Sequence, residues 1–275
     1  MNSKVNNPPA HRPRKRFGQH FLHDKFIIEK IVKVINPVHD DAMLEIGPGL
    51  GVLTTPLLSC LDELHVVELD RDLIEKLKTL FQGIDKLVIH SNDALVFDYC
   101  QIMARNKKIR IVGNLPYNIS TPLIFHLLDQ VNCIEDMTFM LQKEVVDRIT
   151  AKPGGKDYGR LSVMIQLRCA TKKLFDVPAN AFSPPPKVIS SVIYMKPYKK
   201  IPWNIKNLDD FAKIVRFSFA QRRKTIRNSL KSLSEDLSWL DKTEIDLSKR
   251  PETLSVETFS RLANAFTEKK IANNE

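Results

Sequence analysis

A regular alternation of short apolar segments and amphipathic segments between residues 41 and 141 constrains the fold most strongly. Five short apolar runs have the character of buried β-strands: Ala42–Ile46, His65–Leu69, Leu87–Ile89, Ile109–Val112 and Met137–Leu141. Segments with apolar residues at helical spacing separate most of these runs. Three of them are Leu50–Leu61, Leu73–Phe81 and Leu123–Leu128. Strands that alternate with helices predict right-handed βαβ units and an α/β fold, with a parallel sheet covered on both faces.

The pattern changes after residue 150. We expect a helix over Leu161–Ala170 and strands over Leu174–Val177 and Val188–Met195, on either side of a rigid proline loop at 184–186. From residue 207 onward the sequence reads as helical, with helices at Leu208–Phe219, Thr225–Leu233 and Val256–Phe266. The chain has only 9 glycines and none beyond residue 159, which agrees with helices there. We therefore expect a basic arm over 1–16, a Rossmann-like domain over 17–200 and a small all-helical domain over 201–275.

Charge and cysteine content narrow the class of protein. The net charge is +10 and the sequence pI is about 9.4, which favours a partner with negative charge. Residues 1–16 carry five basic side chains and no acid, so we interpret them as a flexible arm that either touches nucleic acid or is a solubilising tail. No run is apolar and long enough for a membrane span. The cysteines contain no CxxC pair, so we expect free, mostly buried thiols in a reducing compartment; they are Cys60, Cys100, Cys133 and Cys169.

A glycine-rich turn follows the first predicted strand, in the sequence Glu45-Ile46-Gly47-Pro48-Gly49-Leu50-Gly51. It is not the GxGxxG fingerprint of dinucleotide-binding proteins, and Pro48 removes one of the backbone donors that a phosphate cradle needs. Polar side chains end the next three strands: Glu68, Asp93 and Asn114. Because the carboxyl ends of parallel strands form the ligand-binding edge of such sheets, we expect an adenosyl cofactor without a pyrophosphate, and S-adenosylmethionine fits. The alternative is a tight turn with a packing role only.

The tetrapeptide Asn114-Leu115-Pro116-Tyr117 suits methyl transfer to an exocyclic amine of a nucleic-acid base. The lone pair of such an amine is delocalised into the ring, and acceptors on its N–H groups draw it toward a nucleophilic geometry. The side-chain oxygen of Asn114 and the carbonyl of Leu115 are the candidate acceptors, while Pro116 stiffens the turn. Tyr117 is placed to stack on the base. An Asx-type turn with a packing tyrosine would fit the tetrapeptide alone equally well.

Several motifs together resemble the ribosomal RNA adenine N6-dimethyltransferases, and among them the bacterial KsgA type. They are Gln19–Leu22, Glu45–Gly51, Val67–Asp70, Asn114–Tyr117, Ala181–Val188 and Phe219–Thr225. The resemblance covers about residues 11–265. It implies dimethylation of two adjacent adenines in a stem-loop near the 3′ end of 16S rRNA, with S-adenosylmethionine as methyl donor, coupled to assembly of the small ribosomal subunit.

The resemblance also implies which residues contact the cofactor: His20, Leu22, Gly47, Glu68, Asp93 and Asn114. The family usually has Asn where this chain has His20, which leaves open whether this contact uses the backbone or the side chain. Phe182, in the proline-stiffened loop, is expected to form the second face of a clamp around the target base; the alternative is that it belongs to the core. His20 and His23 are too isolated to predict a metal site.

The stretch 213–231 contains seven basic side chains and no acidic one. A one-signed excess on this scale predicts RNA binding, for which the candidates are Arg222, Arg223, Lys224 and Arg227; the alternative is a solvated helix face. The expected partners are 16S rRNA and the small-subunit precursor, for a monomeric cytoplasmic enzyme without membrane contact. The competing functions are a non-catalytic RNA-binding assembly factor, a large-subunit rRNA adenine methyltransferase that confers antibiotic resistance and, more distantly, a nicotinamide-dependent dehydrogenase.

Overall fold

The computed structural model of the chain describes residues 19–103, 107–221, 223–234, 236–241 and 243–272. The predicted basic arm over 1–16 lies outside these ranges. Among the described residues, we find no helical stretch whose length and hydropathy would suit a bilayer crossing.

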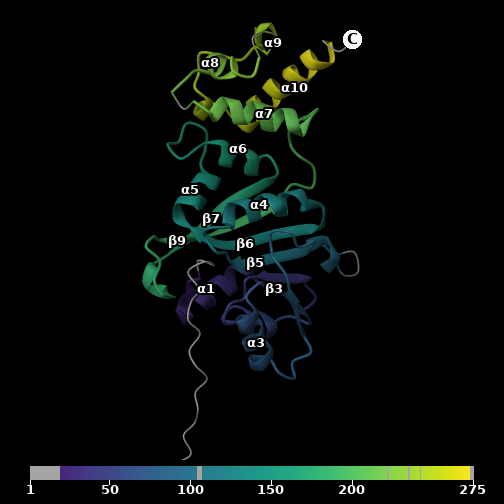
Figure 1. Ribbon diagram of the computed structural model, residues 1–275, viewed down its shortest axis with the longest axis vertical. Coiled ribbons are helices and arrows are strands. Elements are labelled where there is room, and N and C mark those ends of the chain that lie inside the picture. The colour runs from purple at the N-terminus through teal and green to yellow at the C-terminus, as the bar shows by residue number, and fades with distance from the viewer. Residues whose placement is uncertain (1–18, 104–106, 222, 235, 242, 273–275) are drawn as a thin grey trace, which may run out of the picture.

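A seven-stranded sheet forms the centre of the molecule (Figure 1). Its strands, in spatial order, are β4 (Leu87–Ser91), β3 (Leu64–Glu68), β2 (Met43–Ile46), β5 (Ile109–Asn114), β6 (Ile134–Gln142), β9 (Ser190–Pro197) and β7 (Cys169–Val177). The first five pair in parallel, while β9 is antiparallel to both β6 and β7. The predicted α/β fold with a parallel sheet is therefore confirmed, with a switch point between β2 and β5 where the strand order reverses.

Helices cover both faces of this sheet. The helices α1 (Lys25–Ile35), α2 (Thr54–Leu58) and α3 (Arg71–Leu80) share one apolar core with one side of the strands. The helices α4 (Ser120–Asp129), α5 (Lys143–Thr150) and α6 (Arg160–Gln166) share a second core with the other side. Alternation along β2 follows from the strand period of two, because Met43 belongs to the first core and Leu44 to the second. Burial on both faces explains why β2, β3, β5 and β6 read as largely apolar runs, whereas the edge strand β4 is only partly buried.

Short polar side chains set the start of the helices nearest the site. Asp24 accepts a hydrogen bond from the amide of Ile27 (3.1 Å) at the start of α1, and Asp70 accepts one from the amide of Asp72 (3.1 Å) at the start of α3. Each satisfies an amide that has no partner within its helix. Asp70 lies two residues after Glu68, the last residue of β3, so α3 begins beside the carboxyl edge of the sheet.

The sequence pattern missed some elements and misplaced several boundaries, among them those of α2, observed at Thr54–Leu58, and of β7, observed at Cys169–Val177. Helices α1 and α5 were not predicted, and the helix expected over Leu161–Ala170 ends at Gln166. Cys169 and Ala170 instead begin β7, where they pair with Pro197 and Lys196 of β9. Pairing with a distant strand overrides the local helical spacing of these two residues.

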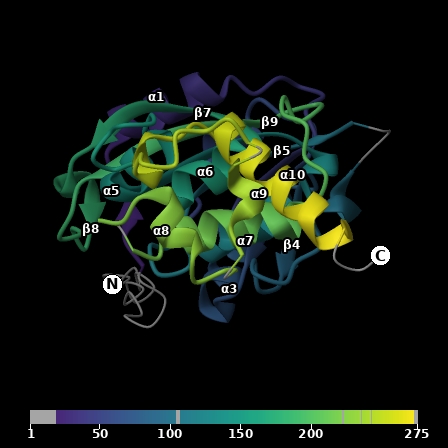
Figure 2. The same cartoon turned by 90° about the horizontal axis from the view of Figure 1, so that it is seen from above.

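The last part of the chain forms a helical layer beyond the β7 end of the sheet (Figures 1 and 2). It contains α7 (Leu208–Phe219), α8 (Ile226–Leu230), α9 (Ser238–Asp241) and α10 (Val256–Ala272). Its core also takes in Tyr158, Val163 and Leu167, which precede residue 200. The Tyr158 hydroxyl donates to the carbonyl of Leu254 (2.9 Å). The helices therefore pack directly on the α6 side of the sheet.

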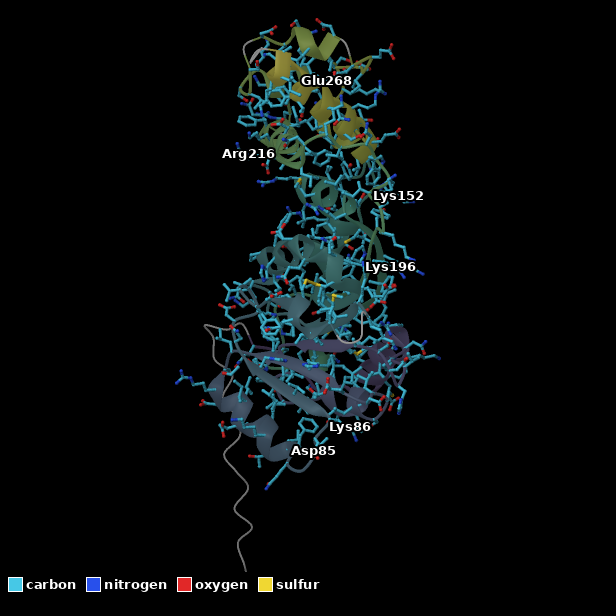
Figure 3. The ribbon with its side chains drawn as sticks, turned by 90° about the vertical axis from the view of Figure 1, so that its right-hand side faces the viewer. Asp85, Lys86, Lys152, Lys196, Arg216 and Glu268 are labelled. Carbon is cyan, nitrogen blue, oxygen red and sulfur yellow. A yellow bond between two sulfur atoms is a disulfide. The ribbon has the colours of Figure 1, made fainter. Side chains whose placement is uncertain are left out.

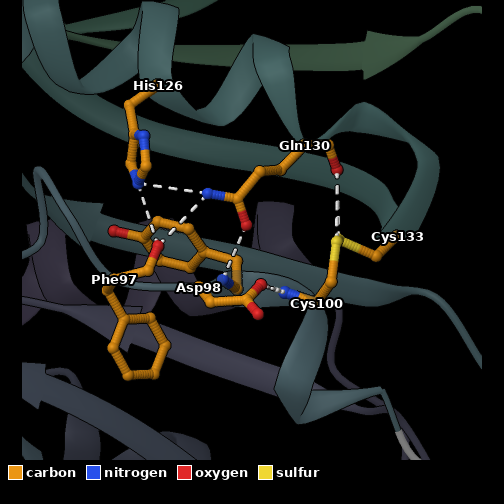
Figure 4. The surroundings of a disulfide bond; sticks show 7 residues. Phe97, Asp98, Cys100, His126, Gln130 and Cys133 are labelled. Carbon is orange, nitrogen blue, oxygen red and sulfur yellow. Dashed lines mark hydrogen bonds between the residues drawn. A yellow bond between two sulfur atoms is a disulfide. The ribbon is translucent and has the colours of Figure 1, made fainter.

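The expectation of four free thiols is wrong for Cys100 and Cys133, which form a disulfide (Figure 4). The two cysteines are 33 residues apart, but the short helices η2 (Tyr99–Ile102) and η3 (Val131–Cys133) place their Cα atoms 5.3 Å apart, within the range for a disulfide. The Gln130 side chain joins the same segments, since its Oε1 accepts from the amide of Tyr99 (2.7 Å) and its Nε2 donates to the carbonyl of Phe97 (3.2 Å). Cys169 is buried as expected, whereas Cys60 is exposed.

Candidate active site

A cavity of about 310 Å³ opens at the carboxyl edge of the sheet, beside the switch point between β2 and β5. The ends of four neighbouring strands line it, through Gly47 after β2, Glu68 at the end of β3, Asp93 after β4 and Asn114 at the end of β5. The structure thus brings together all six residues expected to contact the cofactor, because His20 and Leu22 line the same cavity. The lining runs from Gln19 to Ile119, so chain segments up to 100 residues apart in sequence meet here.

The backbone amides of the glycine turn donate to β3 and to the turn itself. The amide of Gly47 donates to the carbonyl of Val67 (2.9 Å), that of Gly51 to the carbonyl of Pro48 (2.9 Å), and that of Gly49 lies 3.4 Å from Oε2 of Glu68. Pro48 has no amide proton, so the turn presents few donors to a phosphate. Gly49 has φ +59°, and an added Cβ would lie 3.3 Å from the Phe21 ring, so backbone conformation and close packing both favour glycine there. These contacts agree with a cofactor that carries no pyrophosphate.

Glu68 is held in place by the backbone that follows it. Its Oε1 accepts from the amides of Leu69 and Asp70, both at 2.9 Å, and the side chain is buried. Burial raises the pKa of Glu68, and the backbone donors partly offset that effect. Within the described ranges its Oε2 has one contact, the long one with Gly49, so this oxygen is available to accept hydrogen bonds from ligand hydroxyls.

Asp93 has a similarly fixed position. Its Oδ1 accepts from the amide of Leu95 (2.9 Å), and its own amide donates to Oδ1 of Asn92 (2.8 Å). These contacts form a tight turn after β4 and hold the Asp93 carboxylate at the wall of the cavity.

Glu45 is a further carboxylate at the cavity, and the sequence reasoning assigned it no role. Its side chain is only 1% exposed and accepts from the Thr54 hydroxyl (2.7 Å). Burial, and to a smaller degree the charge of Glu68, raise the pKa of Glu45 to about 7. The signal that could have found it is a glutamate inside an otherwise apolar strand, Met43–Ile46.

Asn114 is oriented by a contact with the N-terminal segment. Its Nδ2 donates to the carbonyl of His20 (3.0 Å), which leaves Oδ1 as the free acceptor at the cavity. Leu115 is buried, and its amide donates to the carbonyl of Met140 in β6 (3.1 Å). The turn then closes with a hydrogen bond from the amide of Ile119 to the carbonyl of Pro116 (3.2 Å). The geometry provides the acceptor that an exocyclic amine would need.

Tyr117 is half-buried beside the same cavity. Its hydroxyl hydrogen-bonds Oγ of Ser190 in β9 (2.6 Å), and its ring stacks on His20 with centroids 5.6 Å apart. Burial raises the pKa of Tyr117, so the side chain is neutral around pH 7.

Phe182 lies in the apolar core of this structure. The short strands β1 (Phe21–Leu22) and β8 (Phe182–Ser183) pair with Leu22 opposite Phe182, and the Phe182 ring is 2% exposed within the apolar core. The core alternative describes this arrangement, in which neither face of the ring is open. A role for Phe182 in holding the target base stays a prediction. The sequence could not separate the two cases, because an aromatic residue before a proline loop reads alike in both.

The candidate RNA-binding residues lie in the turn before α8 and within α8. Arg223, Lys224 and Arg227 are exposed, while Arg222 lies outside the described residues. Arg227 pairs with Asp241, whereas Arg223 and Lys224 have no ion-pair partner in the described part of the chain. Arg216 in α7 is also exposed and projects from the helical layer (Figure 3).

Among the described residues, no group of three or more His, Cys, Asp or Glu side chains is arranged to hold a metal ion.

Comparison with known proteins agrees with this geometry. The family model described as "Ribosomal RNA adenine dimethylase" matches residues 10–268. The chain is 51% identical to the ribosomal RNA small subunit methyltransferase A of Chromohalobacter salexigens, over 96% of this chain and 94% of that protein. It is 52% identical to the protein of the same name from Acinetobacter baylyi, over 93% of each chain.

Solved structures show the same architecture. A dimethyladenosine transferase from Plasmodium falciparum superposes with a TM-score of 0.78 at 26% identity, covering 91% of this chain and 98% of that one. The 23S rRNA methyltransferase ErmE superposes with a TM-score of 0.68 at 23% identity, covering 90% and 99%, and therefore shares the fold. This likeness confirms the predicted Rossmann-like methyltransferase fold. The chain belongs to the ribosomal RNA adenine dimethylase family.

Proposed function

We propose that the protein dimethylates N6 of two adjacent adenines in a stem-loop near the 3′ end of 16S rRNA. The observation that carries the proposal is Asn114, which lines the cavity with its Nδ2 bound to the carbonyl of His20, so that Oδ1 has no hydrogen-bond partner among the described residues and can serve as an acceptor. Relatives that are about half identical over nearly the whole chain are named ribosomal RNA small subunit methyltransferase A, which supports the choice of substrate.

The methyl donor is S-adenosylmethionine, and the residues around the cavity suit it. The carboxylate of Glu68 accepts hydrogen bonds from the ribose hydroxyls, as an acidic group does at the end of the second strand of such folds. The glycine turn allows close approach without a phosphate cradle, and Asp93 provides a further acceptor beside it. When bound, S-adenosylmethionine supplies an electrophilic methyl group.

The chain's own residues position the target amine. Oδ1 of Asn114 and the carbonyl of Leu115 accept the two N–H groups, which holds the nitrogen lone pair in line for attack. Tyr117 stacks on the base, a contact that contributes about 1–3 kcal/mol. Orientation of this kind accounts for a large part of the barrier reduction, and no general base is required before attack.

The helical part, residues 201–275, binds RNA in this proposal. Arg223, Lys224 and Arg227 neutralise phosphates, while the target adenine leaves its stack to enter the cavity. An unpaired loop adenine has the smallest unstacking cost, which suits a stem-loop substrate. The enzyme acts as a monomer on the small-subunit precursor in the cytoplasm.

Methyl transfer from labelled S-adenosylmethionine tests the function directly. The purified protein is incubated with small and large subunits from cells that lack this activity, and methylated adenines are mapped by mass spectrometry of the RNA. The proposal expects two adjacent dimethyladenosines near the 3′ end of 16S rRNA. Label in large-subunit RNA alone would support the resistance-type methyltransferase. RNA binding without label would support a non-catalytic assembly factor.

A further inference from the structure

His20 makes three separate contacts around the candidate active site, although it belongs to neither the sheet nor the catalytic tetrapeptide. Its carbonyl accepts from Nδ2 of Asn114 (3.0 Å). Its Nδ1 lies 2.7 Å from the carbonyl of Pro184, and its ring stacks on Tyr117 at a centroid distance of 5.6 Å and an interplanar angle of 28°. One residue therefore contacts both polar ends of the tetrapeptide and the proline loop.

The contact with Pro184 fixes the orientation of the imidazole. A carbonyl oxygen can only accept, so Nδ1 carries the proton and the ring is held against the loop that follows β8. The centroid distance to Tyr117 falls within the range of about 4.5–7 Å that aromatic pairs prefer. Since the Tyr117 hydroxyl is also bound to Ser190, the tyrosine ring is held at its tip by β9 and on its face by His20.

We propose that His20 is a positioning residue for the target adenine, acting through Tyr117 with its ring and through Asn114 with its carbonyl. The proposal rests on the proposed methyl transfer, because it concerns how the base is presented. His20 contributes in two ways, through its backbone carbonyl and through its ring. The backbone contact survives any substitution, whereas the ring contact with Tyr117 requires an aromatic side chain.

Two substitutions separate the two ring contacts. His20→Asn keeps a side-chain donor for Pro184 but loses the stack, and His20→Phe keeps the stack but loses the donor. We expect kcat to fall about 2- to 10-fold in His20→Asn, the range that loss of one aromatic pair gives. We expect His20→Phe to retain most of kcat and His20→Ala to fall at least as far as His20→Asn. The control is His23→Asn, because His23 is exposed three residues further along and its side chain has no partner within the described residues.

Binding measurements show whether the effect belongs to the base or to the cofactor. Calorimetry with S-adenosylhomocysteine should give a Kd within twofold of wild type in all four variants, since the His20 carbonyl remains. RNA affinity, which depends mainly on phosphate contacts, should also stay within twofold. Together with unchanged thermal melting, these values exclude unfolding as the cause of a lower kcat.

The decisive comparison is made in a Tyr117→Leu background. If His20 acts through Tyr117, adding His20→Asn to Tyr117→Leu lowers kcat no further.

A second readout does not depend on methyl transfer. An rRNA fragment with 2-aminopurine at the target position should show less fluorescence quenching on binding to His20→Asn than to wild type. An unchanged kcat and quench in His20→Asn, an equal loss in the Tyr117→Leu background, or an equal loss of S-adenosylhomocysteine affinity would overturn the proposal. Failure of the proposed function is distinct, because the wild-type protein itself would then transfer no methyl group.

Discussion

Asn114 combines two hydrogen-bonding roles in one side chain, and its amide tests the mechanism at the scale of a single residue. Replacing Asn114 with Ala removes the acceptor at the cavity and the donor to His20. We expect kcat for methyl transfer to fall about 10²–10³-fold, the loss typical of one preorganised polar group in an active site. Single-turnover transfer of labelled methyl to immature small subunits measures this.

Cofactor affinity provides the internal control for Asn114→Ala. The cavity wall formed by Gly47, Glu68 and Asp93 is unchanged, so S-adenosylhomocysteine should bind only a few-fold more weakly. Turnover at the wild-type rate would refute the acceptor role. A loss of cofactor binding as large as the loss of turnover would instead make Asn114 primarily a cofactor ligand.

The raised pKa of Glu45 leads to a second prediction for a single residue, which concerns the pH dependence of the free energy of unfolding rather than catalysis. Its pKa is about 7 in the folded protein, above the value of about 4.3 for a free glutamate. Between these two values the folded state binds more protons than the unfolded state, so this group makes stability fall as pH rises. Between pH 5 and pH 8 the loss is about 2–3 kcal/mol. In Glu45→Gln this contribution is absent.

Urea denaturation of both proteins at pH 5 and pH 8 isolates the effect. All other titrating groups are shared, so the change in free energy of unfolding with pH should differ between wild type and Glu45→Gln by about 2–3 kcal/mol. The wild-type protein should show the greater loss. Parallel pH dependence in the two proteins would show that Glu45 titrates in the folded state as it does in water.

At the scale of elements, the sequence predicts those parts of the fold that have a local pattern. The five parallel strands were identified from their short apolar runs, and burial on both faces explains these runs for all of them except the partly exposed edge strand β4. Helix α7 was predicted at its observed bounds, Leu208–Phe219. The direction of β9 was not predictable, since an antiparallel strand has the same local pattern as a parallel one. The two-residue strands β1 and β8 are too short to have any pattern, yet they bring His20 to Asn114 and bury Phe182.

The site residues also fall into those that the sequence predicts and those that it does not. Glycines and carboxylates at strand ends could be identified in the sequence because the parallel sheet places all such ends at one edge. The orientation of Phe182, the contact of His20 with Tyr117 and the burial of Glu45 depend on packing between distant segments. A sequence without pairing information does not specify these contacts.

The Cys100–Cys133 bond gives an element-scale prediction, because it ties η2 to η3 beside α4 (Figure 4). A cross-link over 33 residues restricts the unfolded chain and should stabilise the fold by about 3–4 kcal/mol. We expect reductant, or Cys133→Ser, to lower the free energy of unfolding by that amount. Urea denaturation with and without dithiothreitol measures it.

Counting the free thiols tests the Cys100–Cys133 pairing directly, and a Cys60→Ser variant serves as the control. Alkylation of the urea-unfolded protein without reductant should label Cys60 and Cys169 only, and alkylation after reduction should label all four cysteines. Cys60→Ser is the control, because Cys60 is exposed and unpaired and its replacement should leave the free energy of unfolding unchanged. Four reactive thiols in the unreduced protein would contradict the pairing.

At the scale of the whole molecule, the fold separates the candidate chemistry from much of the positive charge. The cavity lies at the carboxyl edge of β2–β5, while the turn before α8 lies in the helical layer beyond β7 (Figure 1). Arg223 and Lys224 are exposed there without ion-pair partners among the described residues. A substrate that reaches both regions must be large, which suits a folded RNA and is not required for a small molecule.

Removing the charges of Arg223 and Lys224 with a double Ala substitution tests this arrangement. If each contacts a phosphate, the slope of log affinity against log salt should become less steep by about 1.5, and binding at low salt should weaken. Filter binding of 16S rRNA fragments between 50 and 300 mM salt, a range of roughly sixfold, measures the slope. The control is Lys78→Ala with Lys86→Ala, which removes the same charge from the opposite end of the molecule, where Figure 3 shows Lys86. An unchanged slope in the first variant, or an equal change in the control, would mean that RNA does not bind preferentially at the helical layer.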